Sequence, residues 1–182
     1  MTSQKITFTF HFLSDARHFG AGVVLNDNCL WVTGGILHLE NNVQNIVQLK
    51  STEFITFDGA IYGPNMQRAL HGHCVVVINS TFSMIIGGYT ENPEDSTFYF
   101  DHDKYEWING QSLIQARYYH AAGIIIDEVT GEDFVVVTGG QTNAHDSSNS
   151  TEILMDTGWI AGNISVISFH FWTIHLDWDT KT

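Results

Sequence analysis

Basic residues and cysteines are scarce in this sequence. Only 7 of its 182 residues are Lys or Arg, against 20 Asp or Glu, so the formal net charge is −13. That charge repels a phosphate backbone or an anionic lipid surface, and we therefore expect neither nucleic acid nor a membrane as a partner. Because 43% of the residues are apolar and 13% are aromatic, the chain is predicted to fold as one domain with a hydrophobic core.

The two cysteines, Cys29 and Cys74, are accompanied by neither a CxxC motif nor a Cys/His zinc spacing. We expect both to be buried free thiols, which favours a reducing compartment. The sequence also lacks a long hydrophobic run. Its most apolar late stretch, residues 160–178, is interrupted by polar side chains and is not expected to span a bilayer.

The first residues show neither the basic segment nor the unbroken apolar stretch of a signal peptide. Apolar residues alternate from Ile6 to Phe12 instead, which predicts a strand. A cytoplasmic location is therefore expected. Secretion is the alternative if the N-terminus is incomplete, because three glycosylation sequons begin at Asn79, Asn149 and Asn163.

The strongest signal is a repeat built on three apolar strand candidates. Each candidate ends in a pair of glycines, Gly34-Gly35, Gly87-Gly88 and Gly139-Gly140, with spacings of 87−34=53 and 139−87=52. An aromatic residue follows the second glycine at one offset (54−35, 107−88 and 159−140 are all 19), at Phe54, Trp107 and Trp159. An arginine opens each unit, at Arg17, Arg68 and Arg117, and in two units a histidine follows at the same step, at His71 and His120.

Arginine, histidine, apolar strand, di-glycine and closing aromatic, repeated with a period of about 50 residues, resemble the kelch repeat. The resemblance covers Arg17 to Trp159, in repeats of approximately 17–57, 68–108 and 117–160, with 161–182 as the start of a degenerate fourth. The first repeat departs from the pattern, because it has Phe54 in the Trp position and places His18 beside its arginine. The resemblance implies an all-β fold of kelch-type β-propeller blades, about three four-stranded antiparallel sheets in an incomplete ring.

The residues favour the same architecture without the family. In the second unit four short strand candidates, at 73–78, 82–86, 97–101 and 105–108, are separated by turn residues. A sheet of this kind has two apolar faces and cannot bury both alone, so successive sheets are expected to stack. Propellers typically close with four to eight blades. Three units therefore leave open faces, through which we expect the chain to self-associate.

No catalytic residue, metal site or cofactor is predicted. The segment His71-Gly72-His73 places two imidazoles on one side of a strand, but packing explains His71 and no further ligand stands at zinc spacing. Tyr118 and Tyr119 beside His120 resemble the site of copper radical oxidases only superficially, because no pair of Cys and Tyr positions can be matched. The chain is therefore not expected to be an enzyme.

Two residue types of the repeat are expected to be structural. Each repeat arginine should pair with a carboxylate such as Glu53, Glu106 or Glu152 at the junction between sheets, where a planar guanidinium can satisfy several acceptors. Trp107 and Trp159 should lie in the core between sheets, because a large ring buries most of its surface there.

The resemblance implies a non-catalytic protein-protein interaction module or scaffold, and the alternative is part of a galactose-oxidase-like or small-molecule-binding propeller. The loops after the di-glycines, 36–45, 89–96 and 141–150, share one face of such a stack and are the expected binding surface. Their candidate contacts favour a protein partner with a basic contact surface: Glu91, Glu94, Asp95, His145 and Asp146. The opposite face, with Asp127, Glu128, Glu132 and Asp133, is the competing choice.

Overall fold

A computed structural model of the chain describes residues 13–26, 28–39 and 46–162. The strand expected at Ile6 to Phe12 lies outside the described residues, and so does the expected fourth unit from residue 163 onward. The described chain is all β, as predicted, and its strands pair antiparallel throughout. Among the residues described, no helix is long and apolar enough to cross a membrane.

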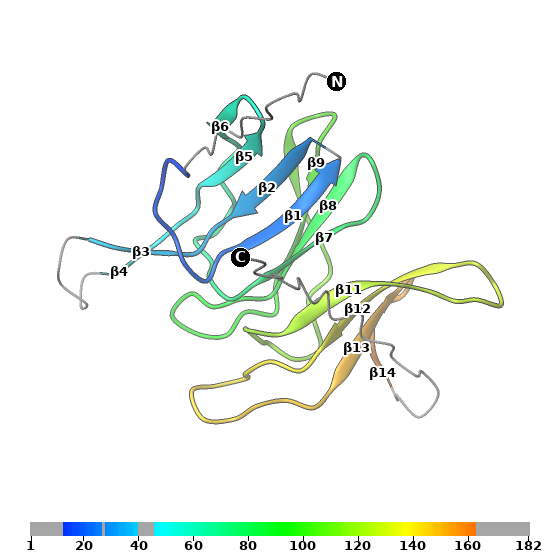
Figure 1. Ribbon diagram of the computed structural model, residues 1–182. Helices are drawn as coiled ribbons and strands as arrows, with labels where there is room; N and C mark the ends of the chain where they lie inside the picture. Colours follow the sequence, from blue (N-terminus) through cyan, green and yellow to red (C-terminus); the bar gives the residue numbers. More distant parts are fainter. Residues whose placement is uncertain (1–12, 27, 40–45, 163–182) are drawn as a thin grey trace, which may run out of the picture.

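Three four-stranded antiparallel sheets follow one another along the chain, as predicted, and a two-stranded sheet that was not predicted accompanies the first of them (Figure 1). Sheet 1 has the order β1-β2-β5-β6, with β1 (Ala21–Asn26), β2 (Cys29–Thr33), β5 (Thr52–Thr56) and β6 (Gly59–Tyr62). Sheet 2 consists of β7 (Cys74–Val77), β8 (Phe82–Ile86), β9 (Thr97–Asp101) and β10 (Glu106–Asn109). Sheet 3 consists of β11 (Ala121–Ile126), β12 (Asp133–Thr138), β13 (Thr151–Met155) and β14 (Gly158–Gly162).

The loop after the first di-glycine is not a plain solvated loop. It forms a two-stranded ribbon, β3 (Ile36–His38) paired with β4 (Ile46–Gln48), and Ile36 is only 6% exposed. The Gln48 side chain of this ribbon donates a hydrogen bond to the carbonyl of Thr90. The loops after the first and second di-glycines therefore lie side by side, as expected for loops that share one face.

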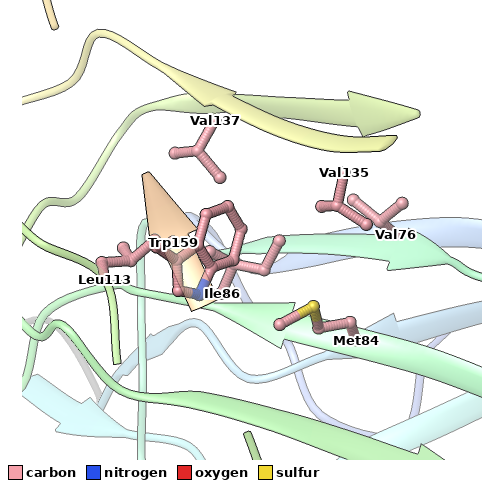
Figure 2. Packing of buried hydrophobic residues seen from close by; sticks show 7 residues of the cluster. All are labelled: Val76, Met84, Ile86, Leu113, Val135, Val137 and Trp159. Atoms are coloured by element: carbon pink, nitrogen blue, oxygen red, sulfur yellow. The ribbon is translucent and has the colours of Figure 1, made fainter. Parts of the chain in front are cut away.

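The main core lies between sheets 2 and 3. Alternation along the strands turns Val76, Met84 and Ile86 of sheet 2 toward Val135 and Val137 of sheet 3. Trp159 of β14 and Leu113 of the preceding connection complete this cluster, in which every side chain is at most 7% exposed (Figure 2). The indole N–H of Trp159 donates to the carbonyl of Gln111 at 2.9 Å, so the ring is buried without an unsatisfied donor.

A second packing region joins sheets 1 and 2 around the fully buried Trp31. The Trp31 ring lies 5.3 Å from the Phe100 ring and 6.0 Å from the Trp107 ring, measured between ring centroids. Beside it a second cluster gathers four buried side chains, Met66, Leu70, Ile85 and Phe98. Sheet 2 is thus covered on both faces, by sheet 1 on one and by sheet 3 on the other.

Phe54 does not occupy the position of Trp107 and Trp159. Those tryptophans lie on the fourth strands of their sheets, opposite Phe100 and Leu154. Ala60 stands at the matching place in sheet 1, whereas Phe54 lies on the third strand and stacks on Trp31. The β3–β4 ribbon lengthens the first loop, so an offset of 19 residues ends on an earlier strand there.

Candidate interaction face

Three short connections lead into the first strands of the sheets, and backbone hydrogen bonds align them. Each forms a two-residue bridge to the segment after the di-glycine of its own unit, His18 with Ile36, His71 with Tyr89, and Tyr118 with Gln141. The residue before each bridge is Arg17, Leu70 and Arg117, respectively. Arg68 therefore stands two positions before the structural equivalent of the other arginines, and His73 rather than His71 matches His120.

In sheet 1 this arginine is part of a buried ion pair. Arg17 Nη2 lies 2.6 Å from a carboxylate oxygen of Glu53, and Nη1 donates to the carbonyls of Gly34 and Ser51. The same carboxylate accepts the backbone N–H groups of Ser14 and Asp15. Burial alone would raise the pKa of Glu53, but these N–H donors and the guanidinium outweigh it, so the pKa is lowered.

Sheet 3 repeats the arrangement. Arg117 Nη2 lies 2.6 Å from Glu152, whose carboxylate also accepts the backbone N–H groups of Ile114 and Gln115. Both side chains are at most 2% exposed. The predicted pairs of Arg17 with Glu53 and Arg117 with Glu152 are therefore present, and each ties the connection to its sheet.

Sheet 2 uses an apolar pair at the same place. Leu70 takes the arginine position and Phe98 takes the position of Glu53 and Glu152, and both belong to one buried cluster. The predicted pairing of Arg68 with Glu106 is wrong, since Arg68 is 52% exposed and pairs with Glu94 at 2.5 Å. Both members of the ion pair are thus replaced together, which leaves no buried charge alone.

Replacing Arg68 with alanine should change the free energy of unfolding by less than about 1 kcal/mol, because an exposed ion pair contributes little. The guanidinium is half in water, and Glu94 keeps the hydroxyl donors of Thr90 and Ser96. Urea unfolding followed by tryptophan fluorescence measures the change. A loss of several kcal/mol would mean that Arg68 has a structural role like that of Arg17.

Aromatic and histidine rings from the three connections and one from the second di-glycine loop, Tyr89, form a continuous strip. We call it the ring strip, and it consists of His18, Phe19, His71, Tyr89, Tyr118 and Tyr119. Neighbouring ring centroids lie between 4.7 Å, for His18 and Phe19, and 6.5 Å, for Phe19 and His71. The Phe19 and Tyr119 side chains are 52% and 44% exposed. The strip runs along the same face as the di-glycine loops, because His18, His71 and Tyr118 are bridged to those loops.

The two most exposed rings of the strip sit on strained backbone. Phe19 has φ of 57° and Tyr119 has φ of 53°, in the left-handed region that favours glycine. The equivalent residue of sheet 2 is Gly72, with φ of 61°. An aromatic side chain at such a φ costs on the order of 1 kcal/mol or more. Both connections thus place a large, half-exposed ring at a position that favours glycine.

The histidines of the second unit do not come together as a site. His71 belongs to the ring strip, and burial together with the nearby His18 lowers its pKa. His73 instead lies in the core, where its Nε2 is 2.8 Å from the Thr33 hydroxyl. Within the described ranges no group of three His, Cys, Asp or Glu side chains could hold a metal ion.

Ser83 and His102 are in hydrogen-bond contact at 2.8 Å, the spacing of a nucleophile and its base. Ser83 is fully buried, however, and the His102 ring packs edge-on against Trp31 and Phe100. No substrate reaches this hydroxyl in the folded chain. Cys29 and Cys74 are free and partly buried, and burial raises the pKa of the Cys74 thiol to about 11, so neither is a ready nucleophile at neutral pH.

The five residues predicted as contacts have different surroundings. Glu94 is held by Arg68, Thr90 and Ser96, so its carboxylate is committed to the loop itself. Asp146 accepts a hydrogen bond from the Asn143 side chain. The other three predicted contacts are exposed and lie in the same two loops: Glu91, Asp95 and His145.

The opposite face holds a groove between sheets 2 and 3, with a volume of about 790 Å³. Two of the four acids that the sequence offered as the competing choice, Glu132 and Asp133, line it, and Asp156 adds a third carboxylate. Tyr99 and Phe134 supply aromatic walls. The groove was not anticipated from the sequence, because its lining comes from strands of two different units.

The ring strip was also missed, although the sequence carries a signal for it. Arg17 and Arg117 are each followed two positions later by an aromatic residue, Phe19 and Tyr119. No protein-family model and no curated protein matches the chain. The geometry of the described residues offers exposed rings beside acidic loops.

Proposed function

We propose that the chain comprises three units of a kelch-type β-propeller and serves as a non-catalytic protein-interaction module. Three four-stranded antiparallel sheets in sequence order, each with a di-glycine after its second strand, support this reading. So do the Arg17 and Arg117 ion pairs, which hold the connections between units in the same way twice.

The ring strip is the proposed contact surface, and the strained exposed rings of Phe19 and Tyr119 carry the proposal. Aromatic side chains are common anchors of protein interfaces because they bury a large area with few rotatable bonds. Glu91, Asp95 and Asp146 add negative charge in the loops that are bridged to the strip. A partner segment that presents Lys or Arg next to an apolar or aromatic side chain fits both features, and its association rate should fall as salt rises.

The test replaces Phe19 and Tyr119 with glycine in one double variant. Glycine relieves the backbone strain at both positions, and Gly72 is the precedent within this fold. We expect the free energy of unfolding to stay within about 1 kcal/mol of the original. Peptides selected from a random displayed library on the immobilised original chain should be rich in Lys and Arg, and the double variant should bind them at least tenfold more weakly.

Tyr105→Gly is the matched control. Tyr105 is also exposed, at 55%, and has φ of 62°, but it ends the β9–β10 turn on the opposite face. Its removal should leave peptide binding unchanged. If the double variant binds as well as the original chain, or if Tyr105→Gly weakens binding equally, the ring strip is not the contact surface. Loss of binding on replacing Glu132 and Asp133 would place the contact in the groove instead.

A further inference from the structure

Consecutive sheets are joined by backbone hydrogen bonds that recur at equivalent positions. In the first series the N–H of the second glycine donates to the carbonyl of the residue that opens the next unit. Gly35 donates to Leu70 at 2.8 Å, and Gly88 donates to Arg117 at 2.9 Å. Glycine is also required at the neighbouring position 34, because a Cβ on Gly34 would lie 2.5 Å from the same Leu70 oxygen.

A second series runs through the strained residues of the connections. The N–H of Gly72 donates to the carbonyl of Phe19 at 2.8 Å, and the N–H of Tyr119 donates to the carbonyl of Gly72 at 2.7 Å. Each junction between sheets therefore has one hydrogen bond of each series, with opposite chain directions. The two junctions of the chain are built alike.

Both series stop at the outer sheets with their hydrogen-bonding groups unused. Within the described ranges the N–H groups of Gly140 and Phe19 have no hydrogen-bond partner, although their equivalents Gly88 and Gly72 do. The space is open as well. A Cβ on Gly87 would lie 2.7 Å from the Arg117 carbonyl, whereas one on Gly139 would meet only the Ser148 carbonyl, at 3.8 Å. The space beside the third di-glycine is therefore not occupied by any described residue.

The outer faces of sheets 1 and 3 are apolar. Register and alternation turn Val24, Leu30 and Tyr62 of sheet 1 away from sheet 2, and they are 63%, 37% and 58% exposed. On sheet 3, Val136, Ile153 and Ile160 face away from sheet 2. Ile160 is 43% exposed, whereas Val136 is 6% exposed. The outer face of sheet 1 is equivalent to the face of sheet 2 that packs on sheet 1. The outer face of sheet 3 is equivalent to the face of sheet 2 that packs on sheet 3. The two outer faces therefore occupy matching places in the repeat, although sheet 1 has Ala60 where sheets 2 and 3 have Trp107 and Trp159.

We propose that two copies of this chain associate head to tail, with sheet 3 of each copy packed on sheet 1 of the other. The Gly140 N–H would then donate to the Arg17 carbonyl of the second copy, and the Phe19 N–H to the Tyr119 carbonyl of the second copy. Six is the only multiple of three within the usual four to eight sheets of a closed ring, so two copies close it. The association follows from the observed junctions and rests on the proposed propeller architecture, but not on the proposed binding surface.

The ring strip already spans the three units of one copy, because Phe19 of the first and Tyr119 of the third meet with ring centroids 5.3 Å apart. The association would place the strip of the second copy on the same face of the ring. The new junction has Gly20 where His73 and His120 insert their imidazoles, so it buries less surface than the inner junctions. The association should therefore be reversible and depend on concentration.

Sedimentation velocity of the full chain over a hundredfold range of concentration tests the proposal. The mass should rise toward twice the 20.4 kDa of one chain and stop there. Gly139→Asn adds a side chain in the open space beside the third di-glycine, and asparagine tolerates the φ of 69° at this position. This variant should fold and dissociate at least tenfold more readily. Leu30→Lys, which places a charge on the outer face of sheet 1, should do the same.

Gly131→Asn is the matched control, because Gly131 has φ of 75° and open space around it in the β11–β12 hairpin loop. It should leave the dimer unchanged. A chain that stays monomeric throughout the range, or a Gly139→Asn variant that dimerises as well as Gly131→Asn, overturns the proposal. Growth beyond two copies into open filaments overturns the closed ring.

Discussion

Replacing Arg117 with leucine should lower the free energy of unfolding by about 3 to 5 kcal/mol, because the change leaves a buried carboxylate without its positively charged partner. Glu152 is 2% exposed and would keep only its two backbone N–H donors. Glu152→Phe should be comparably harmful, since Arg117 is fully buried and would lose its only carboxylate among the described residues. Urea unfolding at neutral pH measures both losses.

The double variant should recover most of that loss. Arg117→Leu combined with Glu152→Phe reproduces the Leu70 and Phe98 pair that sheet 2 already uses at the same position. Replacing a buried ion pair by packed apolar side chains is often neutral or stabilising. The N–H groups of Ile114 and Gln115 would lose their acceptor but lie on exposed residues, where water can replace it. A double variant as unstable as the sum of the single ones would show that the two apolar residues do not fit sheet 3.

The sheets could be predicted because each depends on local signals. Apolar alternation, turn residues and the di-glycines lie within one unit, so β8 and β9 were predicted at their observed bounds, 82–86 and 97–101. Which residues of different units are structurally equivalent was harder to predict. Arg68 and Phe54 occupied matching offsets in the sequence, but loop lengths differ between units, and only the backbone bridges show that Leu70 and Ala60 are the true equivalents.

The candidate site was less predictable than the fold. Acidic side chains in long polar loops suggested the contact surface, yet Glu94 is committed to Arg68 and to its own loop. The ring strip combines residues from three units that are distant in the sequence and close in the fold. The backbone strain at Phe19 and Tyr119 lies in their φ angles, which the amino-acid sequence does not indicate. Sequence could place Phe19 and Tyr119 after the arginines but not beside one another, 5.3 Å apart.

Acidification should destabilise the fold well before its carboxylates protonate, because two core histidines are held neutral. Burial, with the neighbouring His120 and His71, lowers the pKa of His73 to about 3. Burial and then Arg117 lower the pKa of His120 to about 4, against a contribution from the Ile86 carbonyl that raises it. In the unfolded chain both groups have the ordinary value of 6.5.

Between pH 6.5 and the pKa values of these histidines in the folded chain, the unfolded chain binds more protons than the folded chain. The free energy of unfolding therefore falls as pH falls. From pH 7.5 to 5 each histidine should cost about 2 kcal/mol, and the two together about 4 kcal/mol. The lowered pKa of Glu53 removes further stability only in more acidic solution, where that carboxylate takes up a proton.

Urea unfolding of the original chain at pH 7.5, 6 and 5, at one fixed protein concentration, measures this slope. His120→Gln should reduce the slope between pH 6.5 and 5 by about half, because one of the two titrating core groups is gone. His145→Gln is the control, since His145 is exposed in the loop after the third di-glycine and should leave the slope unchanged. A His120→Gln protein with the original slope, or an original chain equally stable at pH 7.5 and pH 5, would show that the buried imidazoles reach water or find acceptors before the sheets separate.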